Sequence, residues 1–174
     1  MATLDQDPSS SDRSNTLQEL PVGLNKWHGI DFDVRGLIQL GLDGTNMQPF
    51  PHRIEGIPVG QKCKALHLIG AVRNVSGSYE DEILYVFVHY ADGSVVKHPM
   101  RLGIDLGDWW MAVISADRPV WIGTNPAARN TANDIAVYHA TWKNPRPDQT
   151  VVSVDFGAPN RGGAPFILAL TAEP

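Results

Sequence analysis

The sequence predicts an all-β protein, with a β-sandwich of jelly-roll type favoured over a closed barrel. Its apolar runs are short and rich in Val, Ile and aromatic residues, which is typical of strands. Gly and Pro recur every several residues between these runs, and no segment keeps an i, i+3, i+4 apolar stripe for three helical turns. About ten strands without a convincing helix indicate two packed sheets.

Composition sets the first limits on function. A chain of 174 residues with 43% hydrophobic and 19% charged residues has the size and composition of one globular domain. The net charge of −5 argues against a nucleic-acid partner, because such a partner normally requires a clustered basic face. No apolar run approaches the roughly 20 residues needed to cross a bilayer, so membrane insertion is not expected. The single cysteine, Cys63, excludes an intrachain disulfide and leaves the compartment unassigned.

The order of elements follows from the apolar runs and the turn residues between them. Residues 1–20 are polar and rich in Ser and Asp, which predicts a flexible N-terminal tail before a sandwich domain over 21–174. Ten strands are expected, at 29–34, 37–41, 64–73, 82–91, 94–102, 109–113, 120–124, 134–142, 150–157 and 166–173.

One turn and one strand can be predicted in more detail. Asp92 and Gly93 separate two apolar runs and predict a type I′ hairpin turn, which requires positive φ at both residues. In 134–142 neither alternating set of side chains is plainly polar. A strand that is buried on one face and covered by a loop or a partner on the other would show this pattern.

The pieces "KALHLIGA", "HYADGS", "DWW" and "TWKNPRPD", in that order within 27–173, resemble the galactose-binding-like jelly-roll modules of bacterial multi-domain proteins. The resemblance implies a β-sandwich accessory domain, often carbohydrate-binding, beside a neighbouring domain of a parent protein. It also favours an extracellular or cell-envelope location, and it allows a structural calcium ion.

The stretch 103–125 holds three of the five tryptophans and is the candidate binding region. If 109–113 is extended, Trp109 and Trp110 point to opposite faces, so one of them lies at the surface or under a loop. An exposed indole can stack on the apolar face of a sugar while acids, amides and Arg bind its hydroxyls. The predicted ligand-binding residues are Trp109, Trp110, Asp108, Arg101, Trp121 and Asn125. In the alternative interpretation the indoles fill the core.

Metal ligands and catalytic groups give weaker patterns. The chain has no H-x-H pair, although His67, His89 and His139 lie on predicted strands and can in principle meet on one sheet face. Asp31 and Asp33 alternate on one strand and point to the same side, which makes them candidate ligands for calcium; no other cofactor is expected.

No catalytic residue is assigned. The chain has no G-x-S-x-G elbow, and sequence spacing does not show whether two acids face each other across a cleft. The expected function is therefore non-catalytic carbohydrate binding. A structural or protein-interaction domain and a small hydrolase acting on glycans remain the alternatives.

Overall fold

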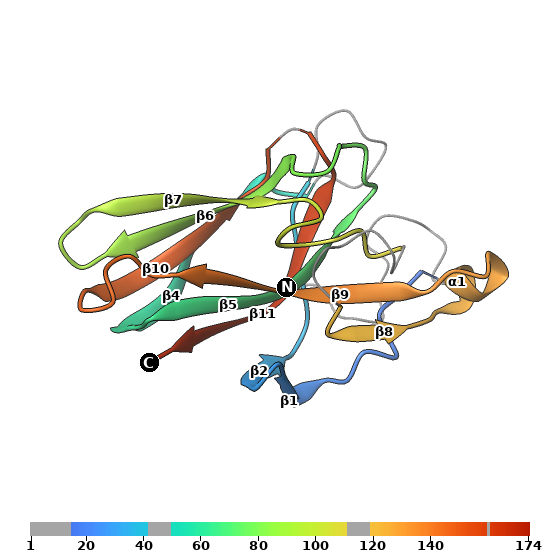
Figure 1. The fold of residues 1–174 in the computed structure, drawn as a ribbon, viewed down its shortest axis with the longest axis horizontal. Coiled ribbons are helices and arrows are strands. Elements are labelled where there is room, and N and C mark those ends of the chain that lie inside the picture. The colour runs from blue at the N-terminus through green and yellow to red at the C-terminus, as the bar shows by residue number, and fades with distance from the viewer. Residues whose placement is uncertain (1–14, 42–49, 111–118, 160) are drawn as a thin grey trace.

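The computed structural model describes residues 15–41, 50–110, 119–159 and 161–174, which form eleven strands and one short helix (Figure 1). A four-stranded antiparallel sheet has the order β4-β10-β6-β7. Its strands are β4 (Arg53–Lys62), β10 (Thr150–Gly157), β6 (Glu82–Tyr90) and β7 (Val95–Arg101). A five-stranded antiparallel sheet has the order β3-β11-β5-β9-β8. Its strands are β3 (Ile38–Gln39), β11 (Ala164–Glu173), β5 (Ala65–Arg73), β9 (Ile135–Lys143) and β8 (Trp121–Gly123).

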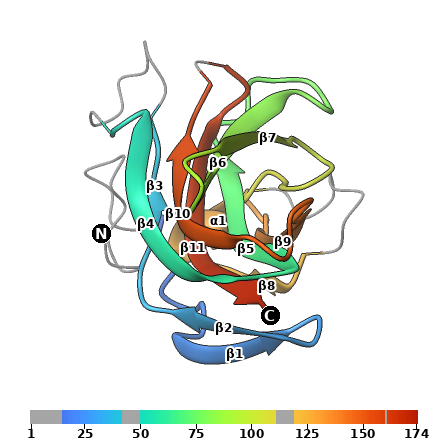
Figure 2. The same cartoon turned by 90° about the vertical axis from the view of Figure 1, so that its left-hand side faces the viewer.

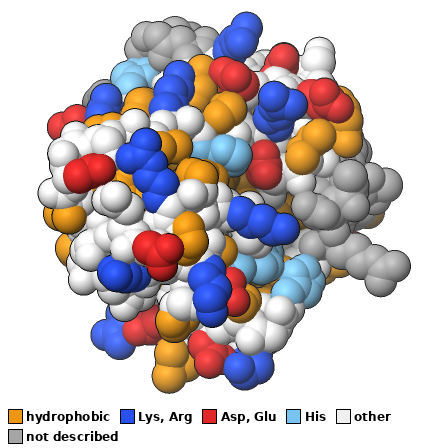
Figure 3. Space-filling view, turned by 60° about the vertical axis from the view of Figure 1, so that its left-hand side comes forward, with side chains coloured by type: hydrophobic (Ala, Val, Ile, Leu, Met, Phe, Trp, Pro, Cys, Tyr) orange, Lys and Arg blue, Asp and Glu red, His pale blue; other side chains and the backbone are white. Residues whose placement is uncertain are grey.

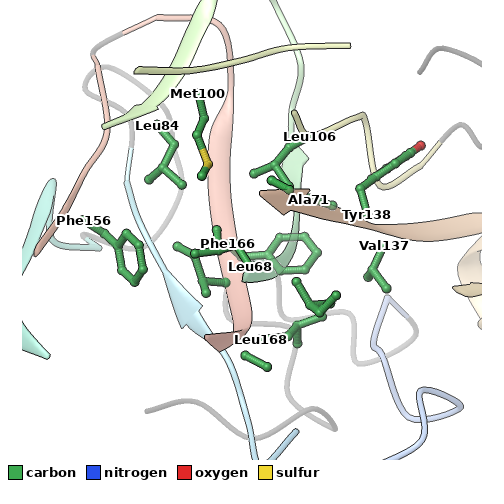
Figure 4. Close-up of a cluster of buried hydrophobic side chains, with 14 of the residues drawn as sticks. Leu68, Ala71, Leu84, Met100, Leu106, Val137, Tyr138, Phe156, Phe166 and Leu168 are labelled. Carbon is green, nitrogen blue, oxygen red and sulfur yellow. The ribbon is translucent and has the colours of Figure 1, made fainter. Parts of the chain in front are cut away.

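The two sheets pack face to face as a β-sandwich, which confirms the predicted fold class (Figure 2). Alternate side chains of each strand point into the space between the sheets because the side-chain period of a strand is two. Leu84, Met100 and Phe156 of the four-stranded sheet meet Leu68 and Phe166 of the five-stranded sheet in one buried cluster (Figure 4).

A separate hairpin forms a third layer against the outer face of the five-stranded sheet (Figures 1 and 2). It consists of β1 (Gly23–Trp27) and β2 (Ile30–Val34). The ring of Phe32 packs edge-on against His139 of β9, and the Thr171 hydroxyl of β11 donates to the Asp31 carbonyl at 2.8 Å. The two-sided burial expected for 134–142 is seen from Ile135 to Tyr138, and the hairpin covers His139, whereas Thr141 on the same face is exposed.

Nine of the ten predicted strands correspond to observed strands, with ends that coincide or differ by at most a few residues. The exception is 109–113, because Trp109 and Trp110 lie in a turn, while 111–113 fall outside the described residues. Strands β1 and β4 and the helix α1 (Pro126–Asn130) were not predicted. In β4, Gly56, Pro58 and Gly60 interrupt the apolar pattern, and the strand tolerates them because it lies at a sheet edge.

The type I′ turn predicted at Asp92-Gly93 is wrong. Only Gly93 has positive φ (84°), and its N–H donates to the Tyr90 carbonyl at 3.0 Å while the Tyr90 N–H donates to the Ser94 carbonyl at 2.9 Å. The loop therefore has three residues and uses glycine at its last position, a common alternative to the two-residue turn. A two-residue turn with positive φ at both positions occurs instead between β1 and β2, at His28 (49°) and Gly29 (82°).

Part of the predicted N-terminal tail, 1–14, lies outside the described residues. Within the remainder, Leu17 and Leu20 are buried in the core cluster, so core packing begins before the boundary expected at residue 20.

Candidate functional site

The segment that carries the DWW sequence is held between β5 and β9 by backbone hydrogen bonds. The Val72 N–H donates to the Gly107 carbonyl at 2.9 Å, and the Trp109 N–H donates to the Val72 carbonyl at 3.0 Å. On the other side, the Ala136 N–H donates to the Trp109 carbonyl at 2.8 Å. Because both neighbours are central parts of the five-stranded sheet, the segment is fixed at the end of a rigid scaffold.

Tyr138 of β9 packs against the same segment and holds it in place. Its ring lies so close to Gly107 that an added Cβ atom would be 2.5 Å from the ring carbon Cζ, so only glycine fits at this position. Its hydroxyl donates to the Asp108 carbonyl at 3.0 Å. Burial, together with the nearby charge of Asp108, raises the pKa of Tyr138 to about 12, so the hydroxyl stays protonated and remains a donor.

The two adjacent indoles have different environments. Trp109 is 5% exposed and packs edge-on against Phe166, with ring centroids 6.1 Å apart. Trp110 is half-buried and tilts against Trp109 at 5.7 Å. One indole thus belongs to the core and the other reaches the surface. The two side chains point in different directions because the backbone turns there, and not because side chains alternate along a strand.

A pocket of about 340 Å³ opens beside Trp110. Asp108, Trp109 and Trp110 line it together with residues from the end of β5 and from the N-terminal segment. The additional lining residues are Asn15, Arg73, Asn74 and Val75. The pocket therefore combines indole surface with carboxylate, amide and guanidinium groups, the mixture that ligand sites use for affinity and orientation.

Among the described residues that line this pocket, one acid and one base carry charge. Asp108 is half-buried, and burial raises the pKa of its carboxyl group although the Trp110 N–H donates to it at 3.0 Å. The buried Arg73 guanidinium lies 5.2 Å from the centroid of the Trp109 ring, within cation–π range. Asp108 is the only acid among the described residues that line the pocket.

Asn125, a predicted ligand residue, is 2% exposed and caps the helix α1. Its side-chain oxygen accepts from the Ala128 N–H at 2.7 Å. Its amide donates to the Thr16 carbonyl at 3.0 Å and to the Asn15 side-chain oxygen at 3.1 Å. Asn125 thus positions Asn15 at the pocket and does not line the pocket itself.

The structure places Arg101 and Trp121 outside the lining of this pocket. Arg101 ends β7 and is exposed, and its N–H donates to the Asp105 carboxylate at 2.7 Å. Trp121 is half-buried on β8, where its indole covers Gly123 and packs against the core. The structure therefore brings together three of the six predicted ligand residues.

A second polar cluster, which the sequence did not indicate, lies on the outer face of the four-stranded sheet. The buried carboxylate of Asp155 accepts from Arg53 at 2.7 Å, from His89 at 2.8 Å and from the Gly56 N–H at 2.9 Å. Burial opposes ionisation of this carboxyl group, but the three hydrogen bonds outweigh burial and hold its pKa below the ordinary value. These bonds tie β4, β6 and β10 together.

The histidines on predicted strands do not all meet. His89 lies on the four-stranded sheet with Asp155, whereas His67 and His139 lie on the outer face of the five-stranded sheet, within 3.0 Å of each other. His139 also contacts His28 of the β1–β2 turn. Burial, and then the neighbouring His67 and His28, lower the pKa of His139 to about 4.

The calcium candidates Asp31 and Asp33 are exposed on one face of β2, as predicted. Asp31 pairs with Lys26 and Asp33 with Arg35, each at 2.7 Å. Among the described residues, no group of three or more His, Cys, Asp or Glu side chains is arranged to hold a metal ion.

Comparison with known proteins found no match to any family model, curated protein or solved structure. Within the described part of the chain, no helix has the length and apolar character required to span a membrane.

Proposed function

We propose that this protein is a non-catalytic carbohydrate-binding module of galactose-binding-like, jelly-roll type, and that the Asp108–Trp110 pocket is its binding site. The observation that carries the proposal is the placement of a half-buried indole beside Asp108, Asn74 and Asn15 in one pocket. The parent protein would be a bacterial multi-domain protein of the envelope or the exterior, as the sequence resemblance implies.

Five of the lining residues have roles in this proposal. The Trp110 indole packs on the apolar C–H face of a sugar ring, which aromatic side chains favour over water. The Asp108 carboxylate accepts from sugar hydroxyls, and the amides of Asn15 and Asn74 both donate and accept. Trp109 remains in the core and supports Trp110 from behind.

The lining of the pocket favours binding over hydrolysis. Glycosidases use two carboxyl groups that flank the scissile bond. Among the described residues that line this pocket, Asp108 alone has a carboxyl group, so these residues do not supply the pair that a glycosidase uses. The rigid backbone support from β5 and β9 also suits a preformed binding site.

A titration of the whole chain with a panel of mono- and oligosaccharides, followed by tryptophan fluorescence, tests the proposal. Calcium is included in one arm and chelated in the other. This comparison tests whether binding depends on a structural calcium ion, for which Asp31 and Asp33 are the candidate ligands. A saccharide that shifts the emission of the native protein, but not of the Trp110→Ala variant, supports the assigned pocket. Folded protein that responds to no saccharide would favour a protein-interaction role, and cleavage of a glycan would favour the hydrolase.

A further inference from the structure

A row of hydrogen-bonded side chains connects the β1–β2 hairpin to the five-stranded sheet. His28 Nδ1 in the hairpin turn lies 3.2 Å from His139 Nδ1 on β9, and His139 Nε2 lies 3.0 Å from His67 Nδ1 on β5. His67 Nε2 lies 3.3 Å from a carboxylate oxygen of Glu173 on β11. His28 is exposed, His139 half-buried and His67 buried, and Figure 3 shows adjoining histidine side chains at the surface. The row therefore runs from solvent into the layer between the hairpin and the sheet.

The row is complete when all three imidazole rings are neutral. The Glu173 carboxylate only accepts, so His67 Nε2 carries a hydrogen and His67 Nδ1 is left as an acceptor. His139 Nε2 then donates to His67 Nδ1, which leaves His139 Nδ1 as an acceptor for the N–H of His28 Nδ1. Each of the three contacts thus contains one hydrogen, and His139 joins the hairpin to the rest of the row.

The row can hold one extra proton but not two. The three contacts have room for one hydrogen each, and the exposed Nε2 of His28 can carry a fourth. Three neutral imidazoles already supply three hydrogens, so one ring of the row can be charged. A second added proton places two N–H groups face to face in one contact, between neighbouring cations. Burial, and then the neighbouring His67 and His28, accordingly lower the pKa of His139 to about 4.

The charges that face His139 come from within the row. Lys26 and Asp31 pair with each other at 2.7 Å and lie on the exposed face of the hairpin, away from the sheet. Glu173 contacts His67 at the far end of the row. None of the carboxylates that the structure describes is hydrogen-bonded to His139 itself, so a second positive charge there has no direct counter-charge among them.

The hairpin is anchored more firmly at its base than at its tip. At the base, Phe32 and Val34 are fully buried in the core cluster. At the tip, residues 27–31, the side chains are exposed or half-buried. Besides the histidine contact, the tip is joined to the sheet by the 2.8 Å hydrogen bond from the Thr171 hydroxyl to the Asp31 carbonyl. Loss of the histidine contact would therefore free the tip while the base stays packed.

We propose that the His28–His139 contact is an acid-sensitive latch, which fastens the tip of the β1–β2 hairpin to the five-stranded sheet at neutral pH and releases it in mildly acidic solution. Separation leaves His28 in solvent, where it takes up its own proton, while His139, His67 and Glu173 keep their contacts with one another and can hold a second. The released form therefore binds one more proton than the latched form. The latch lies on the hairpin side of the five-stranded sheet and is independent of the proposed sugar pocket.

Proton linkage gives the direction and the size of the effect. In the latched form the pKa of His139 is about 4, against 6.5 for an ordinary histidine. The latch is therefore fully effective above about pH 6.5 and weakens as the pH falls toward about 4. A difference of one bound proton raises the ratio of released to latched hairpin by up to about tenfold per pH unit in this range.

Proton NMR of the full chain across this pH range tests the latch. Nuclear Overhauser contacts between Asp31 and Thr171 report whether the tip lies on the sheet, because the two residues are hydrogen-bonded there. We expect this tip contact at about pH 7.5 and its loss by about pH 4.5, as the imidazole resonances show the rings becoming charged. The core contact between Trp109 and Phe166, whose ring centroids are 6.1 Å apart, should persist throughout.

Two variants should remove the acid response. His139→Gln has no titrating ring on the sheet, and His28→Asn suits the positive-φ turn and supplies an oxygen that can accept from a charged His139. Both should keep the tip contact at about pH 4.5. His98→Gln is the matched control, because His98 is a half-buried histidine on β7 of the other sheet whose pKa burial also lowers. This control should release the tip as the native protein does.

Three results would overturn the proposal. The first is a tip contact that persists in the native protein at about pH 4.5. The second is loss of the tip contact only together with the core contact, which would mean global unfolding. The third is acid release that is unchanged in the folded His28→Asn variant.

Discussion

The hydroxyl of Tyr138 donates a 3.0 Å hydrogen bond to the backbone carbonyl of Asp108, and through it β9, an interior strand of its sheet, supports one side of the candidate pocket. The same ring occupies the space that a side chain at position 107 would need. Tyr138, which is 30 positions from Asp108 in the sequence, thus helps to determine where Asp108 and Trp110 lie.

Tyr138→Phe should therefore affect both stability and ligand binding. Loss of one hydrogen bond should lower the free energy of unfolding by about 1 kcal/mol, measured by urea denaturation. The freed Asp108 backbone should also weaken saccharide binding. Tyr90→Phe is the matched control, because Tyr90 donates a buried hydrogen bond to Asn144 on a different part of the sandwich. It should lower stability by a comparable amount without changing saccharide affinity.

The two indoles should respond differently to truncation. Trp109→Ala removes a core side chain and should lower the free energy of unfolding by about 3–5 kcal/mol. Trp110→Ala removes a half-buried side chain and should cost clearly less, while the native circular dichroism spectrum is retained. If the two variants lose equal stability, Trp110 is a core residue and its role as a binding platform fails.

Asn125 should affect binding through Asn15. Asn125→Ala should lose the cap of α1, at a cost of about 1 kcal/mol, and should also release Asn15. Asn125→Ser retains a side-chain acceptor for the cap but is too short to reach Asn15. We expect Ser to recover most of the stability in thermal melts and to leave saccharide affinity as low as in the Ala variant. Full recovery of affinity by Ser would show that Asn15 does not contact the ligand.

Asp155 should make the stability of the sandwich pH-dependent. Because its folded-state pKa lies below the unfolded value, its contribution is fully present above the unfolded pKa and is lost as the pH falls through the folded pKa. Asp155→Asn should lower the free energy of unfolding by about 2 kcal/mol near neutral pH. The difference between native protein and variant should shrink on acidification in denaturant titrations. A difference that stays constant down to strongly acidic pH would contradict the assigned ionisation.

Much of the fold was predictable because most strands are short apolar runs rich in Val, Ile and aromatic residues, bounded by turn residues. The strand 150–157 was predicted with its observed bounds, since Val151, Val154 and Phe156 are buried between turn residues. The edge strand β4 was missed because its glycines and proline mask the alternation. The strand β1 was missed because it is short and polar and leaves Leu24 82% exposed.

The candidate site was predictable only where its residues are neighbours in the chain. Asp108, Trp109 and Trp110 are consecutive, so the sequence could associate them. Arg73 and Asn74 reach the pocket because β5 ends beside the DWW segment, and Asn15 reaches it through Asn125. The positions of Arg73, Asn74 and Asn15 at the pocket depend on how distant segments of the chain pair, and short-range sequence patterns do not specify that pairing. The same reason hid the meeting of His28 with His139, since β1 was not predicted.

The most direct measurement for the central claim is a saccharide titration of the native protein and the Trp110→Ala variant, with tryptophan emission and calorimetry followed in parallel. The proposed function predicts a saccharide that binds the native chain saturably, shifts its emission, and loses most of its affinity in the folded variant. A saccharide that binds both proteins equally, or the absence of any saccharide that binds the folded native protein, would contradict the Asp108–Trp110 pocket as a carbohydrate site.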